Sequence, residues 1–181
     1  NEPAVVFLNE DGNYEMVAGH RRKRACELAG IETIPVIVKN INRDEATILM
    51  GESNLQSREE ILPSEKAFTY KKMLDAMNRQ GKRTDLTSSP LGTKLVGTRS
   101  NVLLSEEVGE SKSQIHRYIR LTYLIPELLN LVDQGKMSIR PAVEVSYIDS
   151  EGQKSIYDYY QDTLDIDDAG KEISPGVLPS L

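Results

Sequence analysis

Several features that would mark an exported, membrane or metal-binding protein are missing from this chain. It has one cysteine, Cys26, in 181 residues, which excludes an internal disulfide and any zinc site built from several cysteines. Its two histidines, His20 and His116, are too isolated to form a metal site. No apolar run is long enough to span a bilayer, and no signal-peptide pattern is visible. We therefore expect no membrane contact and a cytoplasmic location.

The composition is that of an ordinary soluble protein, with 28% charged and 39% hydrophobic residues. A chain of 181 residues can hold one or two domains with a hydrophobic core. It begins at Asn1, without methionine and inside what reads as a strand. We therefore expect a fragment of a longer protein.

The net charge of −6 argues against binding to nucleic acid, but the distribution of charge reverses that argument. The basic stretches are residues 15–43, with six Lys or Arg against three acids, residues 66–99, with eight against two, and residues 111–140, with five against two. Residues 141–181 hold two against nine. Contact with DNA depends on a local basic face, so the value for the whole chain is misleading here.

The first part of the chain is typical of a small α+β unit. Asp11-Gly12 is a hairpin-turn signal between two short alternating stretches. Asp44 is a candidate N-cap for a short helix. The expected elements are strands at 4–8, 14–18 and 33–38 and helices at 25–29 and 44–50.

The second part is dominated by helical patterns. Pro63 fits the first position of a helix that Gly81 ends. Ser111 and Gln114 form an S-x-x-Q capping box, so a helix should begin after Ser111. The further helices expected are 101–108, one from Pro126 to Gln134, and 140–147. The domains expected are 1–80, a linker rich in Gly, Ser and Thr at 81–100, an all-α domain at 101–165, and a frayed tail at 166–181.

A glycine turn directly before a helix carries four cations, His20, Arg21, Arg22 and Arg24. The free N–H groups and positive dipole of a helix N-terminus attract phosphate, and guanidinium groups add charged hydrogen bonds. Cations at a helix N-terminus oppose the helix dipole and so destabilise the helix locally. A local destabilisation of this kind indicates a functional site. The alternative is a solvated basic first turn.

The helix after Ser111 presents polar and basic residues that suit a DNA groove. Gly109 would be the turn of a helix-turn-helix whose second helix enters the major groove. Arg or Lys suits guanine and Gln suits adenine, whereas Arg120 and Arg140 suit phosphate. The alternative is a three-helix structural bundle. The candidates are Lys112, Ser113, Gln114, His116, Arg117, Arg120 and Arg140.

Three blocks resemble the ParB family of plasmid and chromosome partition proteins. Gly19 to Ala25 is similar to its G-E-R-R-x-R-A box, Glu52 to Ala67 to its E-N-x-Q-R…P-x-E-x-A box, and Glu106 to Leu121 to its helix-turn-helix, in the same order. The resemblance covers about residues 4–147. It implies a ParB/sulfiredoxin-like N-terminal domain followed by an all-α helix-turn-helix domain.

The resemblance also implies a pocket for CTP and Mg²⁺. Glu52 would serve Mg²⁺ or the attacking water, so CTP hydrolysis is a possible activity. His20 replaces the family's usual Glu, and Ser57 displaces the arginine of the second box by one residue. From the residues alone, that box also reads as a capping loop before Pro63. The residues implied for the nucleotide are Gly19, His20, Arg21, Arg22, Asn54 and Arg58.

The function implied is that of a DNA partition protein that loads at a centromere-like site and acts as a CTP-dependent clamp. The partners implied are double-stranded DNA, a ParA-type ATPase and a second copy of the chain, joined through a region not found here. The location implied is the nucleoid or a plasmid. The alternative is a sequence-specific transcription regulator of the same fold without nucleotide switching. The third alternative, a redox enzyme, is disfavoured because Gly19 stands where the sulfiredoxin family has its catalytic cysteine, and Cys26 lies inside the expected helix. A two-metal nuclease cluster is not visible.

Overall fold

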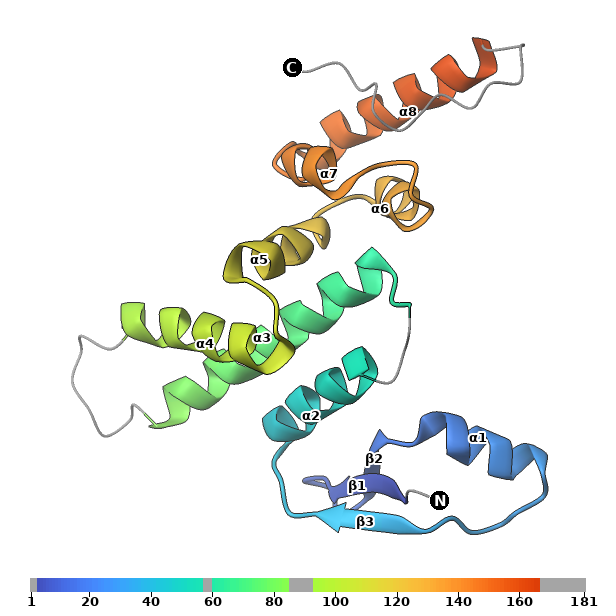
Figure 1. The fold of residues 1–181 in the computed structure, drawn as a ribbon, viewed down its shortest axis with the longest axis vertical. Coiled ribbons are helices and arrows are strands. Elements are labelled where there is room, and N and C mark those ends of the chain that lie inside the picture. The colour runs from blue at the N-terminus through green and yellow to red at the C-terminus, as the bar shows by residue number, and fades with distance from the viewer. Residues whose placement is uncertain (1–2, 57–59, 85–92, 167–181) are drawn as a thin grey trace. The chain divides into compact units, whose positions relative to one another are not determined.

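The computed structural model of the protein describes residues 3–56, 60–84 and 93–166. It divides the chain into two units, one formed by residues 1–59 and 72–108 and the other by residues 60–71 and 109–181. A small sheet and many helices confirm the expected α+β class (Figure 1). None of the helices in the described ranges is long and apolar enough to cross a bilayer.

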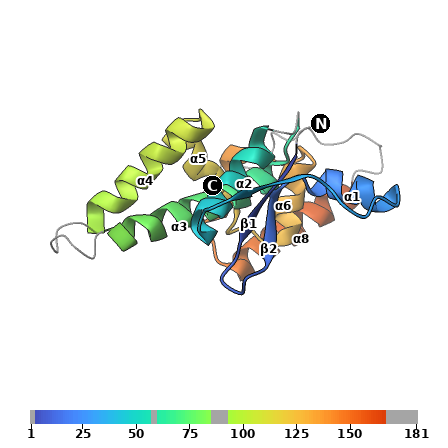
Figure 2. The ribbon, with the colours of Figure 1, turned by 90° about the horizontal axis from the view of Figure 1, so that it is seen from below.

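A three-stranded sheet organises the first unit. Its strands are β1 (Ala4–Leu8), β2 (Tyr14–Ala18) and β3 (Val36–Lys39). β1 is central, antiparallel to β2 and parallel to β3, and Figure 2 shows β1 and β2 running side by side. The three strands match those expected, although β3 begins later, because Pro35 precedes it and contributes no backbone donor.

The hairpin between β1 and β2 closes through one side chain. The Oδ1 atom of Asn9 accepts hydrogen bonds from the backbone N–H groups of Asp11, at 3.1 Å, and Asn13, at 2.8 Å. Gly12 has a φ of 76°, a conformation that glycine adopts without strain. The turn therefore forms where the Asp-Gly pair predicted it.

Two helices complete this layer, α1 (His20–Leu28) and α2 (Arg43–Gln56). α2 packs on β2 and buries Ala46 against Phe7 and Val17. α1 packs on β1 but has no buried residue. The core of this layer therefore comes from β1, β2 and α2.

The start of α2 corrects the expectation that Asp44 caps the helix. Asn42 is the cap, because its Oδ1 accepts from the backbone N–H groups of Asp44 and Glu45 at 2.9 and 3.0 Å. Glu45 accepts in return from the backbone N–H of Asn42 at 2.9 Å, which is a reciprocal capping box. Asp44 is buried and accepts instead from Arg79, whose Nε and Nη2 atoms both lie 2.8 Å from its Oδ1.

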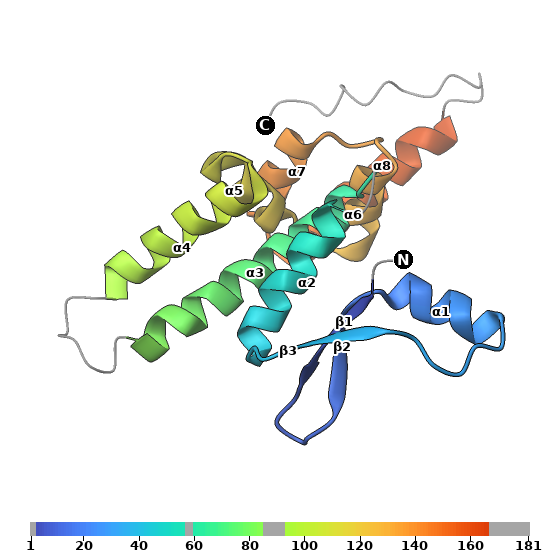
Figure 3. The same ribbon diagram turned by 60° about the horizontal axis from the view of Figure 1, so that its bottom comes forward.

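The next two helices are longer than expected, α3 (Pro63–Thr84) and α4 (Thr93–Val108). The linker expected at 81–100 is wrong over 81–84, which continue α3, and over 93–100, which form the first half of α4. Residues 85–92 lie outside the described residues. An existing helix gains one hydrogen bond with each added residue, so glycine and threonine near its end do not always stop it. Figures 1 and 3 show α4 alongside the second half of α3.

The second unit is helical. After the first turns of α3 it contains α5 (Lys112–Leu121), α6 (Pro126–Asp133), α7 (Ile139–Val145) and α8 (Ser150–Ile166). Its core joins residues from α3, α5, α6, α7 and the turns between the last three: Ala67, Leu121, Leu124, Leu128, Leu131, Val132, Met137, Ala142 and Val145. α8 was not expected as a helix. The tail expected from residue 166 lies outside the described residues from 167 onward.

One buried residue of α8 is hydrogen-bonded to the backbone of two turns in this unit. Gln153 is 2% exposed, and its Oε1 accepts from the backbone N–H of Ile125 at 2.8 Å. Its Nε2 donates to the carbonyl oxygens of Tyr123 and Ile148 at 3.1 and 2.9 Å. Its carboxamide therefore satisfies backbone groups on both sides of α6 and α7, as a buried amide must.

Candidate functional sites

Gly19 joins β2 to α1 in a conformation that requires glycine. Its φ is 106°, in the left-handed region. A Cβ atom at this position would lie 2.7 Å from the Cβ of Ala4 and 3.0 Å from its Cα. Ala4 is 2% exposed in the central strand β1, so it has little room to move. The first residue of the basic box is therefore fixed by the backbone and by its close approach to the sheet.

The first turn of α1 has the features expected of a phosphate site. Within the described residues no side chain caps this turn, and the turn contains no acid. His20, Arg21 and Arg22 are all exposed beside it. Uncapped N–H groups and cations at one helix end suit an anion. The arrangement matches the sequence-based argument, and its use for a nucleotide stays a prediction.

The two cations further along α1 have a local partner. Arg24 Nη1 lies 3.2 Å from Glu27 Oε2, and Lys23 Nζ lies 3.9 Å from Glu27 Oε1. All three side chains are well exposed, where such pairs contribute little to stability. Cys26 is a free thiol on the same helix. Arg24 and Lys23 thus share the Glu27 carboxylate as a partner within α1.

Glu52 lies on α2 and is engaged by α4. Its carboxyl group is hydrogen-bonded to Glu107, and Lys39 of β3 also acts on it. Burial and then the Glu107 carboxyl raise the pKa of Glu52 to about 7, while Lys39 opposes the rise. A hydrogen bond between two carboxyl groups requires a proton on one of them. α2 packs on α4, and this contact was not expected from the sequence.

The other residues of the second box are less informative. Asn54 is exposed near the end of α2, and Arg58 lies outside the described residues. No group of three potential metal ligands occurs in the described part of the chain. Burial and the neighbouring Glu107 carboxyl favour the protonated form of Glu52, whereas a Mg²⁺ ligand would be the charged carboxylate. Its roles in metal binding and hydrolysis stay predictions from the resemblance.

The predicted start of α5 is confirmed. Ser111 caps the helix, and its Oγ accepts from the backbone N–H of Gln114 at 3.2 Å. Ile115 and Leu121 are buried at 2% and 0% exposure, which fixes the inward face. The outward face presents the polar residues proposed for DNA: Lys112, Ser113, His116 and Arg117 are exposed and Gln114 is half-buried.

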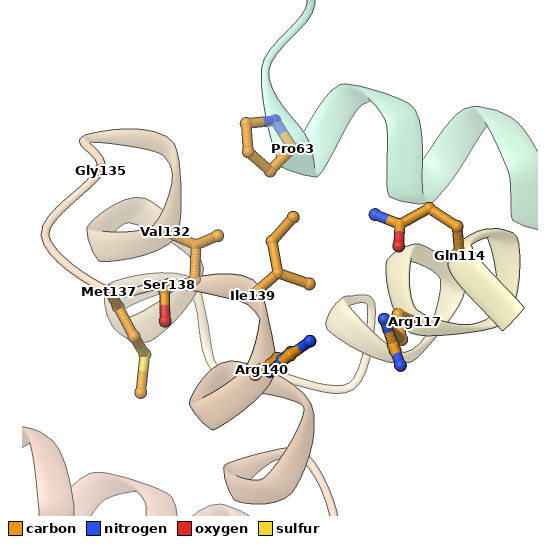
Figure 4. A pocket seen from close by; sticks show the side chains of 9 residues that line it. All are labelled: Pro63, Gln114, Arg117, Val132, Gly135, Met137, Ser138, Ile139 and Arg140. Carbon is orange, nitrogen blue, oxygen red and sulfur yellow. The ribbon is translucent and has the colours of Figure 1, made fainter. Parts of the chain in front are cut away.

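A cavity of about 570 Å³ lies beside the start of α5. Gln114 and Arg117 line it from α5, and Ile139 and Arg140 line it from α7 (Figure 4). α5 packs on α7, which brings together residues that the sequence argument had placed in separate helices. Pro63, Val132, Gly135, Met137 and Ser138 complete the lining. The cavity is therefore basic and hydrogen-bonding on one side and apolar on another.

Comparison with known proteins identifies the first part of the chain. Residues 1–55 match the family model of the ParB N-terminal domain. The chain carries a ParB N-terminal domain. The basic box from Gly19 and the first four residues of the second box, Glu52 to Leu55, lie within this match, so the ParB resemblance expected from the sequence is confirmed.

Curated ParB-type relatives extend the likeness beyond this domain. The nucleoid occlusion protein of Geobacillus sp. (strain WCH70) is 37% identical over 125 residues, which are 65% of this chain and 41% of that protein. The chromosome-partitioning protein Spo0J of Thermus thermophilus is 31% identical over 137 residues, 76% of this chain and 42% of that protein. The chain thus matches about two fifths of the length of these relatives.

A solved ParB structure has the same fold. The C-terminally truncated chromosome-partitioning protein ParB from Caulobacter crescentus, complexed to the centromeric parS site, has a TM-score of 0.50 to this chain. The match is 21% identical and covers 88% of this chain and 76% of that one. At this identity the likeness concerns the fold.

Arg120, which we expected to contact phosphate, has partners within the ParB-like chain. Its Nε donates to the Oγ of Ser146 at 2.9 Å and its Nη2 to the carbonyl oxygen of Ser146 at 2.6 Å. The guanidinium lies 4.6 Å from the ring centroid of Tyr123 and 3.9 Å from that of Tyr147. These contacts join the ends of α5 and α7, and sequence reasoning missed them because the partners are far apart in the chain. Its contact with phosphate stays a prediction.

Proposed function

We propose that this chain is the DNA-binding part of a ParB-type partition protein and that it recognises a specific duplex. One observation carries the proposal: Gln114, Arg117 and Arg140 line a single cavity beside the capped start of α5. Guanidinium and carboxamide groups are the side chains that read guanine and adenine in the major groove. The relatives are nucleoid occlusion and chromosome-partitioning proteins, and the Caulobacter ParB was solved with its parS site.

Selection of duplexes from a random pool tests this function. The protein should enrich a defined sequence. Gln114→Ala should cost about 1–3 kcal/mol on that sequence and little on random DNA, if Gln114 reads a base. Lys136→Ala is a matched control, because Lys136 is an exposed residue of the same unit that lies outside the cavity. Enrichment of no sequence at all would refute the function.

We further propose that the first turn of α1 holds the phosphates of a nucleotide, which the ParB resemblance identifies as CTP. The donors would be the free backbone N–H groups after Gly19 together with the side chains of Arg21 and Arg22. The phosphate part rests on the uncapped, exposed and acid-free turn. The choice of cytosine and the need for Mg²⁺ rest on the resemblance, as do hydrolysis and clamp closure.

Calorimetry with CTP, ATP, GTP and UTP in Mg²⁺ tests the nucleotide proposal, with and without the selected duplex. CTP should bind most tightly, and Arg21→Ala should weaken it by about 1.5–3 kcal/mol, the value of a charged hydrogen bond. Arg24→Ala removes the same charge from the same helix, but its guanidinium is paired with Glu27, so it should bind nearly as the wild type does. Equal effects of both changes would assign the loss to general charge.

The second candidate is a DNA-binding regulator of the same fold without nucleotide switching. The observation that favours it is that burial and the neighbouring Glu107 carboxyl raise the pKa of Glu52, which disfavours the charged carboxylate that the switch would need. Specific DNA binding with no CTP binding in the calorimetry would establish this candidate. A ParA-type ATPase partner, a homodimer and a place on the nucleoid or a plasmid belong to the first proposal and rest on the resemblance.

A further inference from the structure

The apolar side of the cavity beside α5 has one accessible side chain from α7. Val132 and Met137 line the cavity but are only 3% and 4% exposed, because they belong to the core of the second unit. Ile139 packs against that core but remains partly exposed. In Figure 4 its side chain stands among Pro63, Gln114 and the two arginines. A ligand that enters the cavity therefore meets Ile139.

The neighbours of Ile139 restrict what can lie against it. Gln114 offers a donor and an acceptor, and Arg117 and Arg140 offer only donors. A base edge that satisfies these groups places the adjacent base against an aliphatic side chain. A polar base edge there would lose its hydrogen bonds to water without replacement, which is unfavourable. The C5-methyl group of thymine is the apolar group that the major groove displays.

We propose that Ile139 is a specificity-determining residue that contacts the C5-methyl group of a thymine, next to the base pair read by Gln114 or Arg117. The inference rests on the proposed DNA-binding function and adds to it a requirement for thymine at one position. Ile139 carries no charge and no hydrogen-bonding group, so it acts by apolar contact alone. Ile139 lines the same cavity as Arg140, so it lies on the same surface as a residue that the sequence had identified.

The test removes the methyl group without changing base pairing. Each thymine of the selected duplex is replaced in turn by deoxyuridine, and the dissociation constant is measured for the wild type and for Ile139→Ala. One replacement should weaken the wild type about fourfold, the factor that corresponds to one buried methyl group. The same replacement should leave binding by Ile139→Ala unchanged, because the contact is already lost.

Two variants separate this contact from a general loss of packing. Val143→Ala shortens another α7 side chain that packs on the same core but does not line the cavity, so it should keep the fourfold effect of deoxyuridine. Ile139→Val keeps the branched carbon and most of the packing, so it serves if Ile139→Ala folds poorly. In this variant the effect of deoxyuridine on the dissociation constant should be smaller than in the wild type. Circular dichroism checks that each variant is folded.

The outcomes are distinguishable from those that test the proposed function. In one outcome the protein prefers one duplex, but each deoxyuridine replacement raises the dissociation constant by the same factor in the wild type and in Ile139→Ala. That result overturns the inference and leaves specific DNA binding intact. A protein that prefers no duplex overturns both. A single thymine whose methyl group matters only when Ile139 is present supports both.

Discussion

Gly19 permits a quantitative test of how the chain positions its basic box. In Gly19→Ala the new residue must adopt a φ of 106°, and the left-handed region costs an L-residue about 1–2 kcal/mol. The new Cβ would lie 2.7 Å from the Cβ of Ala4, well inside the optimal carbon separation of about 3.5–4.0 Å. Overpacking of this kind costs about 1–3 kcal/mol more.

The two costs together predict a loss of about 2–5 kcal/mol, a large part of the roughly 5–15 kcal/mol that stabilises a typical domain. Gly12→Ala is the matched control. Gly12 also has a positive φ, 76°, but a Cβ there would meet nothing within 4 Å. It should therefore lose only the conformational part, about 1–2 kcal/mol.

Urea denaturation followed by circular dichroism measures these differences. The double variant Ala4→Gly with Gly19→Ala removes the 2.7 Å contact with the Ala4 Cβ, keeps the 3.0 Å contact with its Cα and keeps the strained backbone, so it should recover a large part of the overpacking cost of about 1–3 kcal/mol as a coupling between the two sites. Equal losses in Gly19→Ala and Gly12→Ala, with no coupling to Ala4, would refute the argument that the close approach of β1 selects glycine at the head of the box.

Two further predictions concern charged side chains in the first unit. Arg79→Ala leaves the buried Asp44 without its charged partner, so it should lower the free energy of unfolding in urea by about 1.5–3 kcal/mol. Arg43→Ala breaks only the exposed 3.8 Å pair with Glu15 and should cost less than about 1 kcal/mol. Equal losses in the two variants would contradict this. The pKa of Glu52 is raised from 4.5 to about 7, so the stability that its protonated form provides is complete below pH 4.5 and is lost as the pH rises to about 7. Between pH 4.5 and about 7 the melting temperature of the wild type should therefore fall relative to that of Glu52→Gln. A difference in melting temperature that does not change with pH would contradict the assignment.

The sequence predicted best those features that depend on neighbouring residues. The hairpin at Asp11-Gly12, the cap at Ser111 and the helix start at Pro126 each depend on a few adjacent residues, and each is confirmed. Asn42 was missed as the cap of α2 because Asp44 is an equally good cap by residue type. Only the position of Arg79 shows that Asp44 is needed elsewhere.

The contacts that the sequence did not predict join residues far apart in the chain. Glu52 with Glu107 and Arg120 with Ser146 depend on how whole helices pack. Charge alone also misleads, because a basic residue expected to face phosphate can equally donate to a carbonyl oxygen of its own chain, as Arg120 does. The cavity beside α5 was not predictable for the same reason, although three of its lining residues were named in advance.

The carboxamide of Gln153 has a consequence for the dynamics of the turn that follows α5. An amide proton exchanges with solvent only while its hydrogen bond is open, and the N–H of Ile125 is bonded to Gln153. The same side chain binds the carbonyl of Tyr123, just after α5. Slow exchange at Ile125 would thus report how long α8 stays docked. The helix proposed to read DNA is thus followed by a turn that α8 holds, although α8 contains none of the residues proposed to bind DNA.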